Sequence, residues 1–370
     1  MVKKRLLMVL GPTQIEEEIL KKGATPQMYN RTGEFSKILE RVNRNLQYLF
    51  QTKNPVFLLT CSGTGAMEAA VLNTLSKGDE VLAVNGGTFG RRWTEICKKH
   101  GVKVKEIKLK YGQPVDPKDI ERELSRNRNI KAVLTTLNET STGVLTDIKS
   151  IGAIVNSYPA ILVVDGVSGV GVEEMPMDAW HCDVLLTSSQ KAMALPPGLA
   201  FISFSKKALR LAEKAGLKTF YFDVFEYQKN WERNQTAFTP AIALIYQLDP
   251  RLQKIRKEGL ASYRRKYARL TEMLRRGIKA IGLNTAGEKL SNCVTGIWSP
   301  DGIDASKVVE RMQNNYHIYI APSPGDLKTR LFRIGNFGDI KEKDISRMLS
   351  ALKNTLSYFG FRAKPGSKAY

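Results

Sequence analysis

The segment from Ser189 to Gly198, which reads Ser-Gln-Lys-Ala-Met-Ala-Leu-Pro-Pro-Gly, holds the lysine best placed for chemistry. Lys191 follows an apolar, strand-like run at residues 184–186 and precedes a Pro-Pro-Gly turn. A lysine held at such a junction is partly removed from water, which lowers the pKa of its amine. The neutral amine can then form a Schiff base with a carbonyl group. The alternative is an ordinary solvated lysine, because the chain carries 57 Lys and Arg residues.

A carboxylate, Asp165, ends the apolar run Ile-Leu-Val-Val at residues 161–164. A charge at the end of a buried strand must be paired, so this carboxylate needs a cation or an N–H donor. The protonated pyridine nitrogen of a cofactor would be such a donor, and the carboxylate would then make the ring an electron sink. The alternative is a structural carboxylate that caps a turn or a helix before Gly166.

Three loops with small residues follow further strand-like runs. Residues 60–65, Thr-Cys-Ser-Gly-Thr-Gly, open a helix, so their backbone N–H groups could approach an anion; packing alone can require the same turn. Residues 85–90 contain Phe89 between glycines, where it either lies flat against a ring or anchors the start of a helix. Residues 138–143, Asn-Glu-Thr-Ser-Thr-Gly, offer hydroxyls to a ring substituent or form an ordinary polar turn.

The elements that must position these loops alternate between strands and helices. We predict strands at residues 56–60, 80–84, 102–108, 132–136, 161–164, 184–187 and 200–203, with helices at 66–75, 90–99, 117–126 and 147–157. Such alternation predicts an α/β fold with a mostly parallel, buried sheet, and ligands of such folds bind at the carboxyl ends of the strands. After Leu248 we expect one long basic helix, then strands near 293–298, 318–320 and 331–334, and a last helix at 342–359.

The formal net charge of +21 raises a second class of function. Residues 251–280 hold eleven Lys or Arg and two Glu, and clustered cations can bind nucleic acid. Apolar residues recur through the same segment near helical spacing, however, which leaves the cations for the solvent face. These residues are Leu252, Ile255, Tyr263, Tyr267, Leu270 and Leu274. The charge therefore favours a solvated helix, and a positive field would also suit a phosphorylated cofactor and anionic acids.

Cysteine and histidine usage indicates neither a disulfide framework nor a metal site. The four cysteines are far apart and show no Cys-x-x-Cys spacing, and the three histidines lie in no motif. We therefore expect reduced cysteines packed in or near a core and no histidine as the central acid–base group. The longest apolar runs are too short to span a bilayer, and a cytoplasmic location is the simplest expectation.

Taken together, the motifs resemble the class V aminotransferases, pyridoxal phosphate (PLP) enzymes of fold type I, and especially the alanine–glyoxylate and serine–pyruvate branch. The resembling segments keep the family's order from about residue 10 to residue 340. They are residues 10–12 (Leu-Gly-Pro), 62–70 (Ser-Gly-Thr-Gly-Ala-Met-Glu-Ala-Ala), 139–144 (Glu-Thr-Ser-Thr-Gly-Val), 164–169 (Val-Asp-Gly-Val-Ser-Gly), 189–192 (Ser-Gln-Lys-Ala), 196–198 (Pro-Pro-Gly) and 332–335 (Phe-Arg-Ile-Gly).

The resemblance implies a large PLP-binding domain with a mostly parallel seven-stranded sheet sandwiched by helices, and a smaller C-terminal α+β domain. We expect an N-terminal arm at residues 1–20, the large domain at 21–250 and the small domain at 251–370. By the same resemblance, Lys191 would be the Schiff-base lysine and the proton-transfer base, and Asp165 would pair with the ring nitrogen. Phe89 would stack on the ring, and Thr140 would contact its edge near the phenolic oxygen.

The resemblance also implies how the phosphate and the substrate are held. The phosphate would contact Ser62, Gly63, Thr64 and Gln190, together with Gln235 and Thr236 from the neighbouring subunit of a homodimer. Arg333 would clamp the substrate α-carboxylate, which suits a planar, bidentate guanidinium, and Gly11 would border the substrate. The sequence departs from the family at three positions: Phe89 stands where relatives often have Trp, Asn30 where many have His, and Ala237 where Pro is common.

The implied activity is transfer of the amino group of alanine or serine to glyoxylate or pyruvate by a ping-pong mechanism. Aspartate, ureidoglycine and 2-aminoethylphosphonate remain open as donors, because Arg333 would recognise any α-carboxylate. A cysteine desulfurase-like lyase is the nearest rival, but those relatives typically carry His where Gln190 stands. A basic nucleic-acid-binding protein that has kept the fold without catalysis is the rival from another class.

Overall fold

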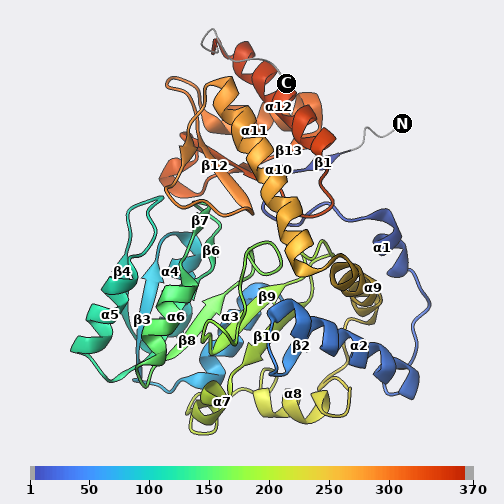
Figure 1. The fold of residues 1–370 in the computed structure, drawn as a ribbon, viewed down its shortest axis with the longest axis vertical. Coiled ribbons are helices and arrows are strands. Elements are labelled where there is room, and N and C mark those ends of the chain that lie inside the picture. Colours follow the sequence, from blue (N-terminus) through green and yellow to red (C-terminus); the bar gives the residue numbers. More distant parts are fainter. Residues whose placement is uncertain (1–4, 363–370) are drawn as a thin grey trace.

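The computed structural model describes residues 5–362; residues 1–4 of the predicted arm and 363–370 of the predicted small domain lie outside this range. A seven-stranded sheet forms its lower part (Figure 1), in the order β2-β10-β9-β8-β5-β3-β4. Six strands run in the same direction, and β10 is antiparallel to both of its neighbours. The strands are β2 (Val56–Leu59), β3 (Glu80–Asn85), β4 (Lys103–Lys108), β5 (Ile130–Thr136), β8 (Ile161–Asp165), β9 (Val184–Ser188) and β10 (Ala200–Phe204). All seven predicted strands are confirmed.

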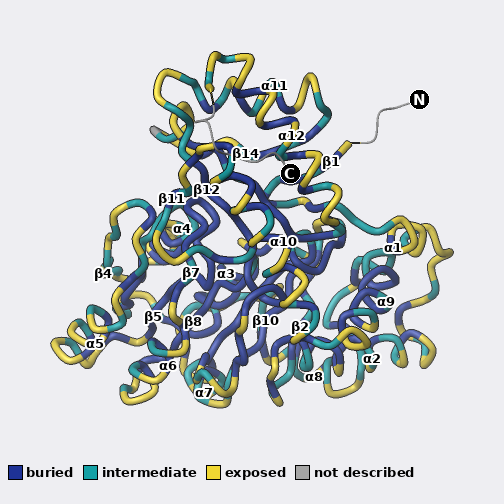
Figure 2. The backbone as a smooth tube through the Cα atoms, turned by 45° about the horizontal axis from the view of Figure 1, so that its top comes forward, coloured by how far each residue is buried: buried dark blue, intermediate teal, exposed yellow. Residues whose placement is uncertain are grey.

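Helices cover both faces of this sheet, because successive strand residues point to opposite sides. In β8, Ile161 and Val163 pack in one core cluster, whereas Leu162 and Val164 pack in the other. The first face is covered by α3 (Gly63–Thr74), α4 (Thr88–Lys99), α7 (Lys206–Ala212) and α8 (Val224–Trp231). The second face is covered by α2 (Gly33–Phe50), α5 (Pro117–Arg126) and α6 (Ile148–Asn156). Figure 2 shows the strands buried between these layers.

The C-terminal part has its own antiparallel sheet, in the order β11-β12-β15-β14. Its strands are β11 (Thr285–Ala286), β12 (Val294–Trp298), β14 (Ala321–Pro322) and β15 (Leu331–Gly335). The helices α10 (Leu260–Ile281), α11 (Ala305–Tyr316) and α12 (Glu342–Tyr358) lie with it, and a 3₁₀ turn spans Gly325–Leu327. The α+β character predicted for this part is confirmed.

The N-terminal segment joins this C-terminal part. Strand β1 (Leu6–Leu7) pairs in parallel with β13 (Ile318–Tyr319), and Gly335 N donates to Met8 O at 2.8 Å. The short helix α1 (Glu17–Lys22) follows, and the hairpin of β6 (Asn138–Glu139) with β7 (Val144–Leu145) stands between the two sheets. The segment after β1 is thereby fixed between the C-terminal sheet and the loops that follow the strands of the large sheet.

The prediction of one long basic helix after Leu248 is wrong. The structure has two helices, α9 (Ile242–Glu258) and α10, separated at Gly259. The φ angle of Gly259 is +80°, a backbone conformation that a continuous α-helix cannot contain and that glycine adopts without steric cost. The six apolar residues predicted to face inward are all buried. In the part of the chain that the structure describes, none of the helices is long and apolar enough to cross a membrane.

Candidate active site

Lys191 lies in the turn that follows β9, at the carboxyl end of the sheet. Its Nζ donates to the carbonyl of Leu10, and the backbone carbonyl of Lys191 accepts from Thr13 Oγ1 at 3.1 Å. Burial lowers the pKa of the Lys191 amine to about 8, while the charge of Asp165 acts in the opposite direction and that of Arg333 lowers it further. The predicted desolvation of this lysine is therefore present.

Gly11 is packed directly against the Lys191 side chain. Its φ angle is +113°, in the region that favours glycine. A Cβ atom at Gly11 would lie 2.8 Å from Lys191 Cδ and 3.1 Å from Gln190 O. No larger residue fits there unless the lysine moves, so the N-terminal segment helps to determine the path of the lysine side chain.

Asp165 ends β8, and only 5% of its surface is exposed. Its carboxylate accepts one hydrogen bond within the described chain, from Val167 N at 2.8 Å. Burial raises the pKa of Asp165 to about 6, partly offset by this hydrogen bond, and the charge of Glu139 adds to the rise. A buried carboxylate with spare acceptor capacity matches a cationic ring nitrogen, which would offset its desolvation.

Ser62, Gly63 and Thr64 form the start of α3. Ser62 caps the helix, because its Oγ accepts from Gly65 N. A Cβ at Gly63 would lie 2.7 Å from Val167 Cγ2 and 3.4 Å from Ser188 Oγ, which brings this turn against the Asp165 loop and the end of β9.

Two buried side-chain atoms at the end of β9 and just after it lack partners within residues 5–362. Ser188 Oγ and Gln190 Oε1 have no hydrogen-bond partner among the described residues. The Ser188 hydroxyl, which would lie 3.4 Å from a Cβ at Gly63, and the N–H groups of the helix start are suitable donors for phosphate oxygens. Gln190 would donate from its amide nitrogen and not from the unpartnered Oε1. The residues present therefore fit the phosphate of PLP.

Phe89 lies in the first turn of α4, where Glu139 fixes the helix start. The Glu139 carboxylate accepts from Phe89 N at 3.2 Å and from Gly90 N at 2.8 Å. Arg92, one helical turn after Phe89, places its guanidinium carbon 4.8 Å from the centre of the Phe89 ring. Its Nη1 donates to Thr64 Oγ1 at 3.0 Å, so Arg92 joins the aromatic ring to the start of α3.

Thr140 connects three parts of the site. Its hydroxyl is 2.7 Å from Ser168 Oγ, in the loop after Asp165, and its carbonyl accepts from Arg333 Nη1 at 2.9 Å. Arg333, on β15, also donates from Nη2 to Pro322 O at 2.6 Å. Its Nε is buried with no hydrogen-bond partner in residues 5–362, and burial lowers its pKa. The guanidinium thus keeps one donor that no described residue satisfies.

A cavity of about 520 Å³ brings five of the predicted site residues together. Its lining includes Gly11, Phe89, Thr140, Lys191 and Arg333. Asp165 and the start of α3 connect to it through the contacts above.

The structure of one chain does not bring Gln235 and Thr236 to this cavity. Gln235 Oε1 and Thr236 O accept from Arg31 Nη1 at 3.3 and 2.8 Å, and Gln235 Nε2 donates to Ser36 Oγ at 2.5 Å. Thr236 Oγ1 is buried without a partner among the described residues. Both residues thus contact the region around the start of α2 rather than the lysine.

Several residues at the site were not predicted from the sequence. Arg92 could have been found, because it lies one helical turn after Phe89. Ser188 adjoins the motif at residues 189–192 and Glu139 begins the motif at 139–144, but nothing local assigns either of them a partner. Within residues 5–362, no group of three or more His, Cys, Asp or Glu side chains is arranged to hold a metal ion.

Comparison with known proteins places this geometry in a family. A family model described as aminotransferase class-V matches residues 13–320. The small subunit of a soluble hydrogenase from Synechococcus sp. (strain PCC 6716) is 36% identical over 363 residues, 97% of this chain and 94% of that protein. A serine–glyoxylate aminotransferase from Methylorubrum extorquens is 32% identical over 374 residues, 98% and 93% of the two chains.

The fold agrees with the sequence comparison. The crystal structure of ureidoglycine-glyoxylate aminotransferase from Bacillus subtilis matches with a TM-score of 0.94 at 28% identity, covering 99% of this chain and 96% of that one. The architecture is that of the fold type I aminotransferases, as the resemblance implied. The chain is a member of the class V aminotransferase family.

Proposed function

We propose that this protein is a PLP-dependent aminotransferase that moves the amino group of alanine or serine to glyoxylate or pyruvate in a ping-pong cycle. The observation that carries the proposal is the cavity that both Lys191 and Arg333 line. Lys191 offers an amine whose pKa is lowered to about 8, and Arg333 offers an Nε donor without a partner among the described residues. A reactive amine and a carboxylate clamp that face one space suit an α-amino acid.

The chemistry divides between the cofactor and the side chains. When bound, PLP supplies an aldehyde that exchanges amines and a protonated ring that withdraws electrons from the substrate α-carbon. In this proposal Asp165 holds the proton on the ring nitrogen, and Phe89 and Thr140 orient the ring. Lys191 Nζ acts as the general base for the α-proton, because a pKa of about 8 leaves part of the amine neutral near pH 7. Ser62, Gly63, Thr64 and Gln190 hold the phosphate.

The cavity lining supports a small substrate side chain. Much of its wall is apolar, formed by Val9, Leu10, Ile320 and Ala321, and its charged residues are Lys191 and Arg333. A second carboxylate, as in aspartate, would have no cation of its own in this lining. The serine–glyoxylate aminotransferase of Methylorubrum extorquens supports serine as donor and glyoxylate as acceptor.

We further propose a cytoplasmic homodimer with shared sites. In this arrangement Gln235 and Thr236 reach the phosphate of the neighbouring subunit. The exposed rings of Phe220, 86% exposed, and Tyr221, 38% exposed, both lie against Phe238, and this aromatic cluster supports burial against a second copy, because contiguous exposed apolar surface marks interaction sites.

A panel of amino donors tests the activity. Purified protein should carry the visible absorption band of lysine-bound PLP, and alanine or serine should bleach it fastest, with glyoxylate or pyruvate restoring it. Lys191→Ala should abolish the band, and borohydride reduction should locate the cofactor on Lys191 by mass spectrometry. A colourless protein, or a Lys191→Ala variant that keeps the band, would overturn the proposal.

Two other results would each redirect it. Rapid cysteine-dependent formation of alanine with sulfide release would indicate a desulfurase-like lyase. A salt-sensitive gel shift with nucleic acid in a protein that binds no PLP would indicate a binding module.

A further inference from the structure

Three consecutive carbonyl groups of the lysine loop (residues 189–195) are held by side chains from distant parts of the sequence. The hydrogen bonds run from Thr13 Oγ1 to Lys191 O at 3.1 Å, from the Tyr263 hydroxyl to Ala192 O at 2.7 Å, and from Arg251 Nε to Met193 O at 2.8 Å. The loop lies outside helices and strands. Backbone hydrogen bonds hold Ser189, Ala194 and Leu195 of the loop, and these three side chains add anchors from distant segments at Lys191, Ala192 and Met193.

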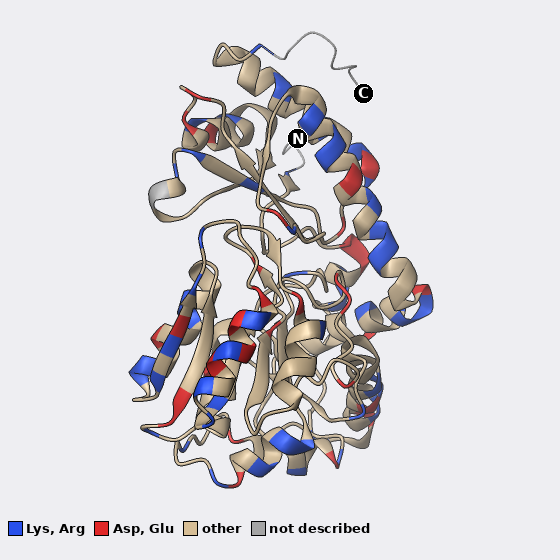
Figure 3. Ribbon diagram, turned by 60° about the vertical axis from the view of Figure 1, so that its left-hand side comes forward, with Lys and Arg blue, Asp and Glu red and all other residues tan. Residues whose placement is uncertain are grey.

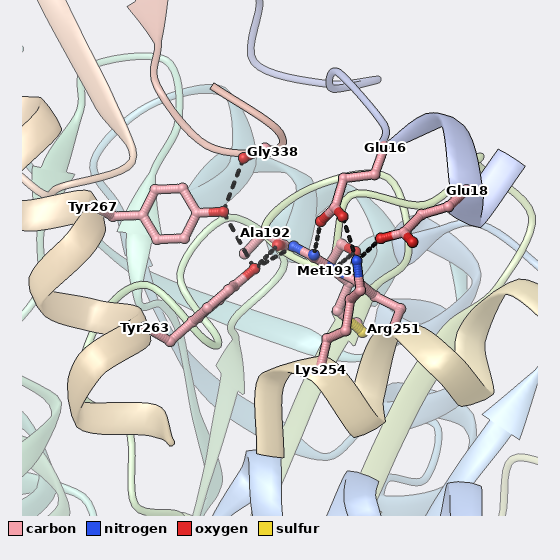
Figure 4. A network of polar contacts seen from close by, with 9 residues as sticks. All are labelled: Glu16, Glu18, Ala192, Met193, Arg251, Lys254, Tyr263, Tyr267 and Gly338. Atoms are coloured by element: carbon pink, nitrogen blue, oxygen red, sulfur yellow. Dashed lines mark hydrogen bonds and ion pairs between the residues drawn. The ribbon is translucent and has the colours of Figure 1, made fainter. Parts of the chain in front are cut away.

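Arg251 and Tyr263 form one buried unit behind the loop (Figure 4). Arg251 is 4% exposed and Tyr263 is 1% exposed. Arg251 Nη2 donates to the Tyr263 hydroxyl at 2.7 Å, and its Nη1 pairs with Glu16 at 2.7 Å. A buried guanidinium is tolerated only when its donors are satisfied, so loss of one acceptor leaves a costly unpaired group.

Tyr267 extends the unit toward the segment that carries the carboxylate clamp. Its hydroxyl lies 3.2 Å from the Tyr263 hydroxyl and 3.0 Å from Gly338 O. Gly338 follows β15, the strand on which Arg333 lies. With one proton, the Tyr267 hydroxyl donates either to Gly338 O or to the Tyr263 oxygen at a time. Buried hydroxyl contacts thus link the lysine loop, through α10, to the segment after the Arg333 strand.

We propose that Tyr263 and Arg251 are positioning residues that fix the lysine loop and so hold the Lys191 amine in the cavity shared with Arg333. Tyr267 ties this unit to the segment after β15. The inference rests on the proposed function, because it takes the Lys191 amine as the group that meets the cofactor.

The position of the amine has a measurable consequence. Burial of Nζ lowers the pKa of Lys191 to about 8, and the charged or titratable groups that act on it are Asp165, Arg333, Cys293 and Arg92. A loosened loop would admit water to Nζ and raise its pKa toward that of a free lysine. At a pH below the pKa, each unit by which the Lys191 pKa rises removes about nine-tenths of the neutral amine. Because only the neutral amine attacks an aldehyde, the attack then slows about tenfold.

The test compares two tyrosine variants. Tyr263→Phe removes one hydroxyl, which donates to Ala192 O and accepts from Arg251 Nη2. Tyr246→Phe is the matched control, because Tyr246 is also buried and its hydroxyl accepts from Met28 N at 2.9 Å, taking no part in the hydrogen bonds of the lysine loop described above. Each protein is purified with cofactor, stripped of it, and mixed with PLP across a pH series. Absorbance gives the rate of covalent attachment, and borohydride trapping confirms Lys191 as the site.

We expect Tyr263→Phe to raise the midpoint of the pH–rate profile by about one unit and to slow attachment about tenfold at pH 7.5, with the control unchanged. Tyr267→Phe, which keeps the Ala192 bond, should shift the midpoint in the same direction by less, and it answers the question if Tyr263→Phe does not fold. Equal midpoints in these variants and the control would overturn the inference. Failure of the wild-type protein to attach PLP at Lys191 would instead overturn the proposed function.

Discussion

Arg92 shows how a single charge can serve a site that is otherwise built from neutral donors. The start of α3 offers hydroxyls and backbone N–H groups, whereas Arg92 Nη1 bonds Thr64 Oγ1 and brings a full positive charge beside them. Its charge also acts on Asp165 and Lys191, so Arg92 lies near both groups. A phosphate held at the start of α3 would gain a charge-assisted interaction from this guanidinium.

Arg92→Gln should therefore weaken binding of PLP about tenfold to a hundredfold, the effect of losing one charge-assisted hydrogen bond. Pyridoxal, which lacks the phosphate, should bind the variant and the wild-type protein within about twofold of each other. Titration of cofactor-free protein with each aldehyde measures both affinities. Arg91→Gln is the matched control, because the exposed Arg91 pairs with Glu95 instead. An equal loss of affinity for the two aldehydes would show that Arg92 does not contact the phosphate.

At the same scale, the sequence predicts site residues that stand in a recognisable local pattern, but not residues whose role depends on contacts with distant segments. Lys191 and Asp165 stand at the ends of apolar runs, where the parallel sheet predicts ligand groups. Arg251 counts only as one of many cations, and Tyr263 only as one position of an apolar stripe. The partner of the Tyr263 hydroxyl, Ala192 O, lies 71 residues away, and no local signal joins the two.

At the scale of elements, the first turns of α2 and α3 offer a direct comparison. Both helices begin with glycine, and alanine in a helix is ordinarily favoured by about 1 kcal/mol. A Cβ at Gly33 would meet no atom within 4 Å, whereas a Cβ at Gly63 would overlap Val167 Cγ2. At Gly63, close packing against the Asp165 loop should therefore outweigh the gain in helix propensity from alanine, whereas at Gly33 no contact in the described chain opposes that gain.

We expect Gly63→Ala to lower the free energy of unfolding by about 1–3 kcal/mol, the usual cost of overpacking. Gly33→Ala should leave it unchanged or raise it by up to about 1 kcal/mol. Urea unfolding of the cofactor-free proteins measures both changes, so that lost phosphate contacts do not contribute. A Gly63→Ala protein as stable as Gly33→Ala would show that the Val167 contact yields without cost.

The extent of helices is harder to predict than their existence, and Gly259 shows why. The apolar spacing on either side of it fits helices, and a single glycine inside such a pattern is usually tolerated. The chain turns there because α9 packs beside α2, whereas α10 crosses to the C-terminal sheet. Only the tertiary arrangement requires that break.

At the scale of the whole molecule, the positive charge lies mainly on the outside of the fold. Figure 3 shows Lys and Arg spread over the helices at the outside of the molecule, with Asp and Glu between them.

The alternation of strands and helices predicted the sheet, but it could not give the strand order, because crossovers place β10 between β2 and β9. Nor could it show that β1 completes the C-terminal part.

The proposed sharing of sites between two copies has a quantitative test. Lys191→Ala should abolish the transferase activity of its own site, and a Gln235→Ala/Thr236→Ala double variant should impair phosphate binding in the partner's site. Each homodimer should then be inactive or nearly so. In a mixed dimer one site lacks both functions, while the other joins an intact lysine to an intact Gln235 and Thr236.

Random pairing during co-expression makes about half of the dimers mixed, and one of the two sites in each mixed dimer is intact. Activity should therefore recover to about a quarter of the wild-type value. Differently tagged copies allow the mixed dimer to be isolated, and its activity per dimer should reach about half. Separately purified variants that are mixed without exchange are the control and should show only the sum of their own activities. Because Gln235 and Thr236 contact Arg31 and Ser36 within one chain, a purely structural role would give no recovery in the mixed dimer.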